Sequence, residues 1–202
     1  MKRATDIYVV GCGPSLKGFD WSLLKDRVVV AVNGAMCSIP DAAYAITADS
    51  RFATMAVACK FWNATAYRVL VMRNDHATFH RVTPFLHEWN LRIEPSRFDG
   101  RIGEKWSEFC TGQNSGFCGM QFAVLLGAKR VHLLGMDFHV NGGEHFHRLY
   151  GGNASKLDEF FTHFKTAVVT LKERGVRVIS HSQSSRLNPF VESIRLEDWR
   201  DG

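Results

Sequence analysis

The chain has 202 residues, of which 46% are hydrophobic and 22% are charged, and its net charge is +5. This length and composition predict one globular domain over residues 1–202, because the chain can bury a full core but is short for two domains. No apolar run is long enough to span a membrane, and no signal-peptide pattern opens the chain, so we expect a cytoplasmic protein. The positive charge favours anionic partners, including nucleotides and nucleic acid.

Apolar runs alternate with helical segments along the chain. Strands are predicted at about residues 6–10, 28–32, 42–47, 67–72, 91–93, 130–135 and 176–179. Helices are predicted over about residues 51–62, 117–127 and 155–174. The stretch 73–110 has a weaker pattern and is expected to form an irregular insertion with short helices. This order predicts an α/β fold: a doubly wound, mostly parallel, Rossmann-like sheet with helices on both faces and a short lid.

The first predicted strand runs directly into Gly11-Cys12-Gly13-Pro14-Ser15-Leu16. Two glycines allow the backbone to approach a ligand closely, and Pro14 suits the first position of a helical turn. A strand that feeds a helix start through a glycine turn is a natural anion site. Leu16 stands where a dinucleotide fingerprint has its third glycine. The motif therefore predicts a phosphate or nucleotide loop of another kind, and the alternative is a tight turn without a ligand.

Polar or glycine-containing clusters follow five of the predicted strands. Ligands of doubly wound sheets bind at the carboxyl ends of the strands. The clusters are Gly11–Ser15, Asn33–Gly34, Asp49–Ser50, Gly135–Asp137 and Ser180–Ser182. We therefore expect them to converge on one site, with His181 either facing that site or serving the fold.

Several motifs together resemble those of the small bacterial CMP-sialic-acid-dependent sialyltransferases. They are the glycine loop, Asn33, Asn114-Ser115-Gly116 at a helix start, and Leu134-Gly135-Met136-Asp137-Phe138. The same skeleton is similar to the MptE-like family, named for archaeal 6-hydroxymethylpterin diphosphokinases. The resemblance covers the start of the chain to about Asn33 and then about Thr111 to Phe138, with a looser similarity at Ser180 to Leu187.

The resemblance implies a nucleotide site built from glycines, hydroxyls and an asparagine. The contacts that it implies are Gly11, Gly13, Ser15, Asn33, Ser115 and Gly116. The placement of the strand ends adds Cys12, Pro14, Asp49 and Gly135. The relatives typically carry asparagine where this chain has Cys12.

The resemblance also implies an inverting sugar transfer from a nucleotide-sugar substrate, without a divalent metal or other cofactor. In the relatives, a lid after the Gly-x-Asp-Phe strand supplies a histidine base, and tyrosines assist the leaving phosphate. The lid of this chain corresponds to about residues 139–154 and lacks the Gly-His-Ser of the relatives. His145 and His147 are the candidate bases, since a histidine with a pKa of about 6.5 can accept a hydroxyl proton near neutrality. Tyr150 is a candidate donor to the phosphate, and Asp137 is a fourth candidate catalytic residue.

Other interpretations of the same residues stay open. Asp137 and Asp49 could hold Mg²⁺ in an ATP-dependent pyrophosphokinase of the MptE-like type. Alternatively, Asp137 could cap its turn, or join His139, His145 and His147 in a metal cluster. A further alternative is a nucleotide- or nucleic-acid-binding protein, or a transferase with a nucleic-acid acceptor. No oligomeric state follows from the sequence.

Overall fold

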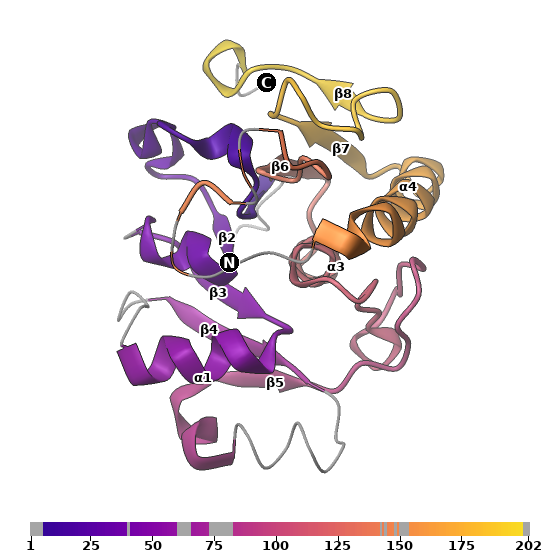
Figure 1. Cartoon of the computed structure of the whole chain (residues 1–202). Helices are drawn as coiled ribbons and strands as arrows, with labels where there is room; N and C mark the ends of the chain where they lie inside the picture. The colour runs from indigo at the N-terminus through magenta and orange to yellow at the C-terminus, as the bar shows by residue number, and fades with distance from the viewer. Residues whose placement is uncertain are drawn as a thin grey trace.

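The computed structural model describes residues 6–39, 41–59, 66–72, 83–141, 143, 145–147, 149 and 154–199. Its strands form one eight-stranded sheet in the order β5-β4-β3-β2-β1-β6-β7-β8, and every described pair is parallel. The strands are β1 (Asp6–Val10), β2 (Val29–Val32), β3 (Tyr44–Thr47), β4 (Tyr67–Val71), β5 (Leu91–Ile93), β6 (Arg130–Leu134), β7 (Arg177–Ser180) and β8 (Glu192–Ser193). The predicted fold class is confirmed (Figure 1).

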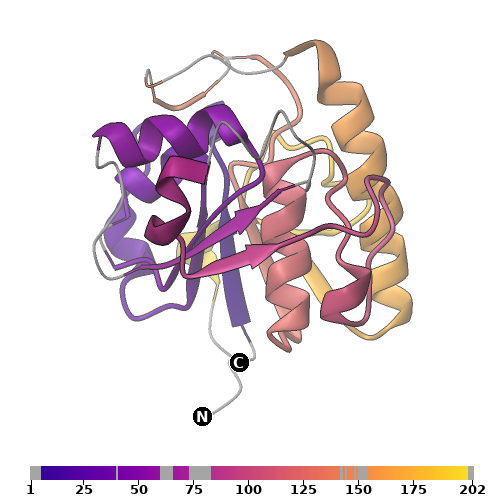
Figure 2. The same cartoon turned by 90° about the horizontal axis from the view of Figure 1, so that it is seen from below.

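Helices cover both faces of the sheet, as Figure 2 shows from below. The described α-helices are α1 (Ser50–Cys59), α3 (Ser115–Leu125) and α4 (Leu157–Glu173). They agree with the predicted helices to within a few residues at each end that the structure describes. Other connections are short 3-10 turns, including Pro14–Leu16 after β1 and Asn33–Cys37 after β2. No helix in the described ranges has both the length and the apolar character needed to cross a bilayer.

The core explains why the strands are nearly continuous apolar runs. Alternate residues of β1 enter different hydrophobic clusters, with Ile7 and Val9 in one and Tyr8 and Val10 in the other. This is the pattern of a central parallel strand that is covered on both sides. On one face α3 packs close to the sheet, because a Cβ at Gly119 would lie 2.8 Å from the Val9 side chain.

Where it is described, the predicted irregular insertion contains the short helices and the short strand that were expected of it. The short strand over Leu91–Ile93 is confirmed, and 3-10 turns occupy Thr83–Glu88 and Trp106–Glu108. The buried Gln121 of α3 accepts a hydrogen bond from the Gly103 N–H at 2.9 Å and donates one to the Gly103 carbonyl at 3.0 Å. These bonds attach the insertion to the core helix. Residues 73–82 lie outside the described residues.

The C-terminal region forms an edge that the sequence did not predict. Strand β8 has only two residues, both exposed, so it carries no apolar pattern. The Ile194 N–H donates to Ser180 at 3.1 Å, and His181 lies 2.8 Å from the Ile194 carbonyl and 2.8 Å from a ring nitrogen of His132. His181 therefore serves the fold here, and it is absent from the cavity described below.

Candidate functional site

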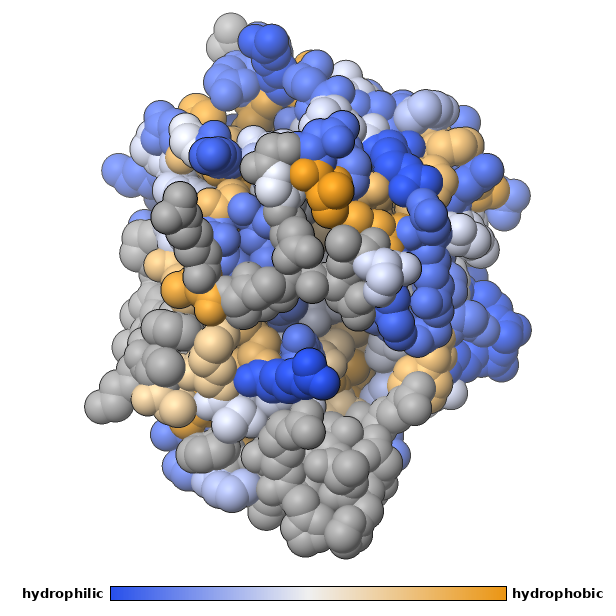
Figure 3. Space-filling model, viewed as in Figure 1, coloured by the Kyte–Doolittle hydropathy of each residue, from blue (hydrophilic) through white to orange (hydrophobic). Residues whose placement is uncertain are grey.

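A cavity of about 790 Å³ lies along the carboxyl ends of the central strands. Figure 3 looks onto this edge of the sheet, and a hollow lies near the middle of the view. Most of the predicted site residues line the cavity. They are Gly11, Cys12, Gly13, Pro14, Asn33, Asp49, Ser115, Gly116, Gly135, Asp137 and His145. Ser15 and His147 do not line it, and Tyr150 lies outside the described residues.

Asp137 braces the glycine loop from the end of β6. Its side chain is only 2% exposed. One carboxylate oxygen accepts from the Ser15 N–H at 2.8 Å, and the other accepts from the Ser15 hydroxyl at 2.7 Å and the Ser182 hydroxyl at 2.5 Å. The Gly13 N–H also donates to the Gly135 carbonyl at 2.9 Å. Both carboxylate oxygens of Asp137 thus accept hydrogen bonds from Ser15 of the glycine loop, and one of them also accepts from Ser182. Its contact with a substrate or Mg²⁺ stays a prediction.

The loop needs a glycine at position 13 for space. A Cβ there would lie 2.3 Å from an Asp137 carboxylate oxygen and 2.6 Å from the Gly135 carbonyl oxygen. Gly13 has a φ of −62°, which any residue adopts, so close approach and not backbone strain explains the glycine. The two loops, after β1 and after β6, are therefore packed directly against each other.

Asn33 presents an unused hydrogen-bond acceptor at the cavity. Its Oδ1 atom is buried and has no hydrogen-bond partner among the described residues. Its φ of +50° is in the left-handed region, and Phe138 at the same cavity has a φ of +59°. Buried unpaired acceptors and strained backbones cost free energy and concentrate at functional sites. Asn33 is therefore suited to accept a hydrogen bond from a ligand amino or hydroxyl group.

Two helices begin at the cavity. Asn114 caps α3 by accepting from the Phe117 N–H at 3.1 Å, and the Ser115 hydroxyl oxygen accepts from the Ala48 N–H at 3.0 Å. Asp49 caps α1 by accepting from the Arg51 N–H at 2.8 Å and the Phe52 N–H at 3.2 Å. Helix N-termini carry partial positive charge, so this end of the cavity favours an anion. Asp49 itself is engaged in the cap.

The structure separates the two predicted lid histidines. His145 lines the cavity, whereas the His147 ring lies over Gly34, where a Cβ would be 2.0 Å from Nε2. Burial, and then the neighbouring His145, lower the pKa of His147 to about 4. His147 is therefore a weak base, and of the two, His145 has the better position for proton transfer at the cavity.

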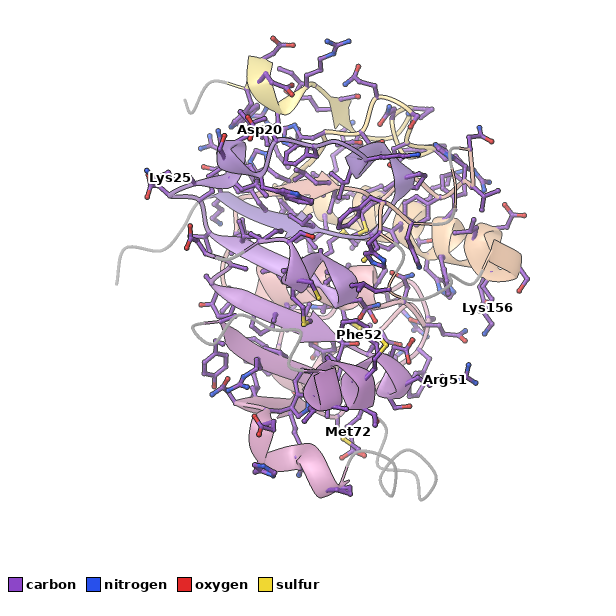
Figure 4. All side chains as sticks on the ribbon, turned by 60° about the vertical axis from the view of Figure 1, so that its left-hand side comes forward. Asp20, Lys25, Arg51, Phe52, Met72 and Lys156 are labelled. Carbon is purple, nitrogen blue, oxygen red and sulfur yellow. The ribbon has the colours of Figure 1, made fainter. Side chains whose placement is uncertain are left out.

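Two cavity residues, His139 and Arg51, did not enter the predicted site as ligand contacts. His139 Nδ1 accepts from the Asn141 N–H at 3.2 Å, while its buried Nε2 has no partner in the part of the chain that the structure describes. The neutral ring then carries its proton on Nε2, which makes His139 a donor at the cavity. Arg51 is the one lysine or arginine among the described lining residues. Figure 4 shows it projecting from the start of α1.

The proposed metal ligands do not come together. Within the described ranges, no three histidine, cysteine, aspartate or glutamate side chains form a group that could hold a metal ion. The His145 and His147 rings lie 5.1 Å apart, but Asp137 is turned toward Ser15 and Ser182. The predicted cluster of Asp137 with the lid histidines is therefore wrong for the residues described.

The stability of the fold should fall in mild acid. Burial lowers the pKa of His147 and of His181 to about 4, whereas histidine in an unfolded chain has a pKa of about 6.5. Between these values the unfolded chain binds more protons, so lowering the pH through this window reduces the free energy of unfolding. We expect the melting temperature to fall from pH 7 to pH 4.5, with a shallower slope for His147→Gln. A melting temperature that rises toward pH 4.5 would contradict these buried neutral rings.

Comparison with known proteins gives matches in solved structures. No protein-family model and no curated protein sequence matches the chain. The sialyltransferase CstII from Campylobacter jejuni, in complex with the substrate analogue CMP-3FNeuAc, has a TM-score of 0.60 at 17% identity and covers 98% of this chain and 89% of its own. The complex of CST-II with a trisaccharide acceptor and CMP gives 0.59 at 18%, covering 97% and 89%.

These matches define the class of protein by its fold. The chain is a Rossmann-like α/β protein with one parallel sheet, and its architecture is that of the sialyltransferase CstII over nearly the whole length. A complex of CstII with cytidine-5'-monophosphate gives the same result, with a TM-score of 0.60 at 16% identity, covering 100% of this chain and 90% of that one. None of these three matches is an MptE-like protein.

Proposed function

We propose that this protein transfers a sugar from a nucleotide-sugar donor to an acceptor hydroxyl, with inversion and without a divalent metal. The observation that carries the proposal is one cavity lined by the braced glycine loop, the unpaired Asn33 acceptor and two helix starts. The fold of CstII, whose structures contain CMP, a donor analogue and a trisaccharide acceptor, supports the same class of reaction.

The nucleotide would occupy the end of the cavity between β1 and β6. The Ser115 hydroxyl and the start of α3 at Gly116 are suited to phosphate oxygens. The Gly11 and Gly13 N–H groups already donate to the Leu134 and Gly135 carbonyls, so these two glycines would serve by letting the nucleotide approach the backbone closely. Asn33 would accept from the nucleoside. Cys12, Pro14 and Gly135 would shape the walls, with Ser15 holding the loop through Asp137.

The chemistry is a single displacement. The acceptor oxygen attacks the anomeric carbon, the bond from that carbon to the phosphate oxygen breaks, and its electron pair stays on the leaving nucleotide. His145 takes the hydroxyl proton, and the Nε2–H of His139 donates to the leaving phosphate. Tyr150 stays a predicted donor, since it lies outside the described residues. No step requires a metal ion.

A turnover assay with matched lid variants tests these roles. Sugar nucleotides of CMP, UDP and GDP are incubated in EDTA with lactose or with DNA as acceptor, and nucleotide release is measured. We expect His145→Gln to lower kcat by about 100-fold, since general bases contribute 10²–10⁴-fold, with donor KM little changed. His147→Gln should cost less. Equal losses for both variants would contradict the assignment of His145 as the base.

The acceptor class is open to the same assay. The net charge of +5 and Arg51 at the cavity favour an anionic acceptor, which includes nucleic acid. If DNA or RNA is the acceptor, its binding should weaken steeply with salt in a filter assay.

Release of AMP from ATP only with Mg²⁺ would instead support the pyrophosphokinase alternative, in which Asp137 and Asp49 would have to leave their present hydrogen bonds.

A further inference from the structure

We infer that residues 145–147 form a clasp in which Phe146, seated against Trp21, positions His145 at the cavity. This inference rests on the proposed function for the role of His145. Phe146 and Trp21 touch no reacting atom in it and are positioning residues. The clasp comprises three described residues in the middle of the predicted lid.

The three side chains of the clasp lie close together at a bend of the chain. The His147 ring centroid lies 5.1 Å from that of His145 and 4.9 Å from that of Phe146. Phe146 also packs on Trp21 at 5.4 Å, and Trp21 packs edge-on against Phe19 at 5.0 Å. All three aromatic residues are partly buried and pack against the hydrophobic cluster that contains Tyr8 and Val10 of β1. Phe146 thus holds the segment against Trp21, while His145 lines the cavity and His147 lies over Gly34.

The backbone of the clasp is attached to the glycine loop. The Phe146 N–H donates to the Cys12 carbonyl at 3.0 Å. Cys12 lines the cavity, and its thiol lies 3.4 Å from the Val32 carbonyl, so the loop is also anchored to the end of β2. The clasp therefore contacts the same loop that is proposed to bind the nucleotide, which fixes His145 relative to the donor.

Gly34 sets how closely the clasp approaches the turn that follows β2. The three atoms nearest to a Cβ built at Gly34 all belong to the His147 ring, at 2.0, 2.6 and 2.8 Å. A methyl group at position 34 would therefore push on the clasp first. Because the obstructing atoms are on one side chain, shortening that side chain should remove the conflict.

This contact gives a mutant cycle that isolates the clasp. Gly34→Ala should lower kcat at least about tenfold by displacing His145, because a misplacement near 1 Å can cost about 100-fold, while CMP affinity changes less than about threefold. The double variant Gly34→Ala/His147→Ala should recover to the kcat of His147→Ala alone. If Gly34→Ala is as active as the wild type, or if the double variant stays below His147→Ala, the clasp is wrong.

The fluorescence of Trp21 tests the contact between Phe146 and Trp21 without a turnover assay. The emission of Trp21, taken as the difference between the wild type and Trp21→Phe, should shift when Phe146→Ala or Gly34→Ala exposes the indole. Phe146→Leu should restore most of both the emission and kcat, since it refills the seat. Unchanged Trp21 emission in Phe146→Ala would contradict the packing of Phe146 on Trp21.

The failures of the two proposals are distinguishable. If wild-type protein neither binds CMP nor turns over any sugar nucleotide, the proposed function fails, whatever the emission of Trp21 shows. If the wild type turns over a donor but the Gly34 and His147 variants act independently, the proposed function stands and the clasp inference fails.

Discussion

Asp137→Asn is expected to lower the free energy of unfolding by about 3 kcal/mol and CMP affinity by at least about tenfold. Its buried carboxylate accepts from the Ser15 N–H, the Ser15 hydroxyl and the Ser182 hydroxyl. An amide NH₂ group in place of one oxygen faces these donors without accepting from them, and hydrogen bonds to a buried charge contribute about 1.5–3 kcal/mol each. Denaturant titration and calorimetry measure the two effects.

Matched variants separate bracing from direct chemistry at Asp137. Ser182→Ala removes one donor and should cause a smaller loss of both stability and affinity. If Asp137→Asn keeps CMP affinity and stability but abolishes turnover, the residue acts on the substrate directly, as the sequence suggested. If Asp137→Asn loses CMP affinity but keeps its turnover at saturating donor, the result supports the bracing role of Asp137.

Gly13→Ala should abolish measurable CMP binding while leaving the sheet folded. The added Cβ would lie 2.3 Å from Asp137 Oδ2 and 2.6 Å from the Gly135 carbonyl oxygen, so the glycine loop must move away from the β6 loop. Because the nearest atoms belong partly to backbone, rotation of a side chain cannot relieve both contacts. We expect at least about a 100-fold loss of affinity, equivalent to about 2.7 kcal/mol.

Lys17→Ala is the matched control for this prediction. Lys17 is exposed and follows the same loop, so its replacement should change stability by no more than about 0.5 kcal/mol. Calorimetric titration of both variants with CMP makes the comparison. Equal affinity for CMP in Gly13→Ala and Lys17→Ala would show that the nucleotide does not use this loop.

Much of the fold followed from the apolar runs. β1 was predicted with the correct bounds, because its buried residues end at Gly11, and Leu91–Ile93 was recognised even within a weakly patterned insertion. β8 was missed because two exposed residues carry no period, and its place depends on pairing with β7. Strands with a pattern of apolar side chains can be predicted from the sequence, whereas a short edge strand that depends on pairing with its neighbour cannot.

The site was predictable in position but not in its internal contacts. Parallel strands bring their ends to one edge, so Gly11, Asn33 and Asp49 were expected together and do line one cavity. The brace joins residues 122 and 45 positions apart in the sequence, and no local pattern reveals such hydrogen bonds. The same limit applies to the lid, where spacing alone could not tell that His145 faces the cavity and His147 faces Gly34.

The cavity is expected to bind a nucleotide without a metal. Calorimetric titration of CMP, UDP, GDP and ADP into the full chain, in EDTA and again with Mg²⁺, tests it most directly. We predict saturable binding of at least one nucleotide at one site per chain in EDTA, weakened in Asn33→Ala by about tenfold through loss of one hydrogen bond. Binding that appears only with Mg²⁺, or no binding of any nucleotide, would contradict the account.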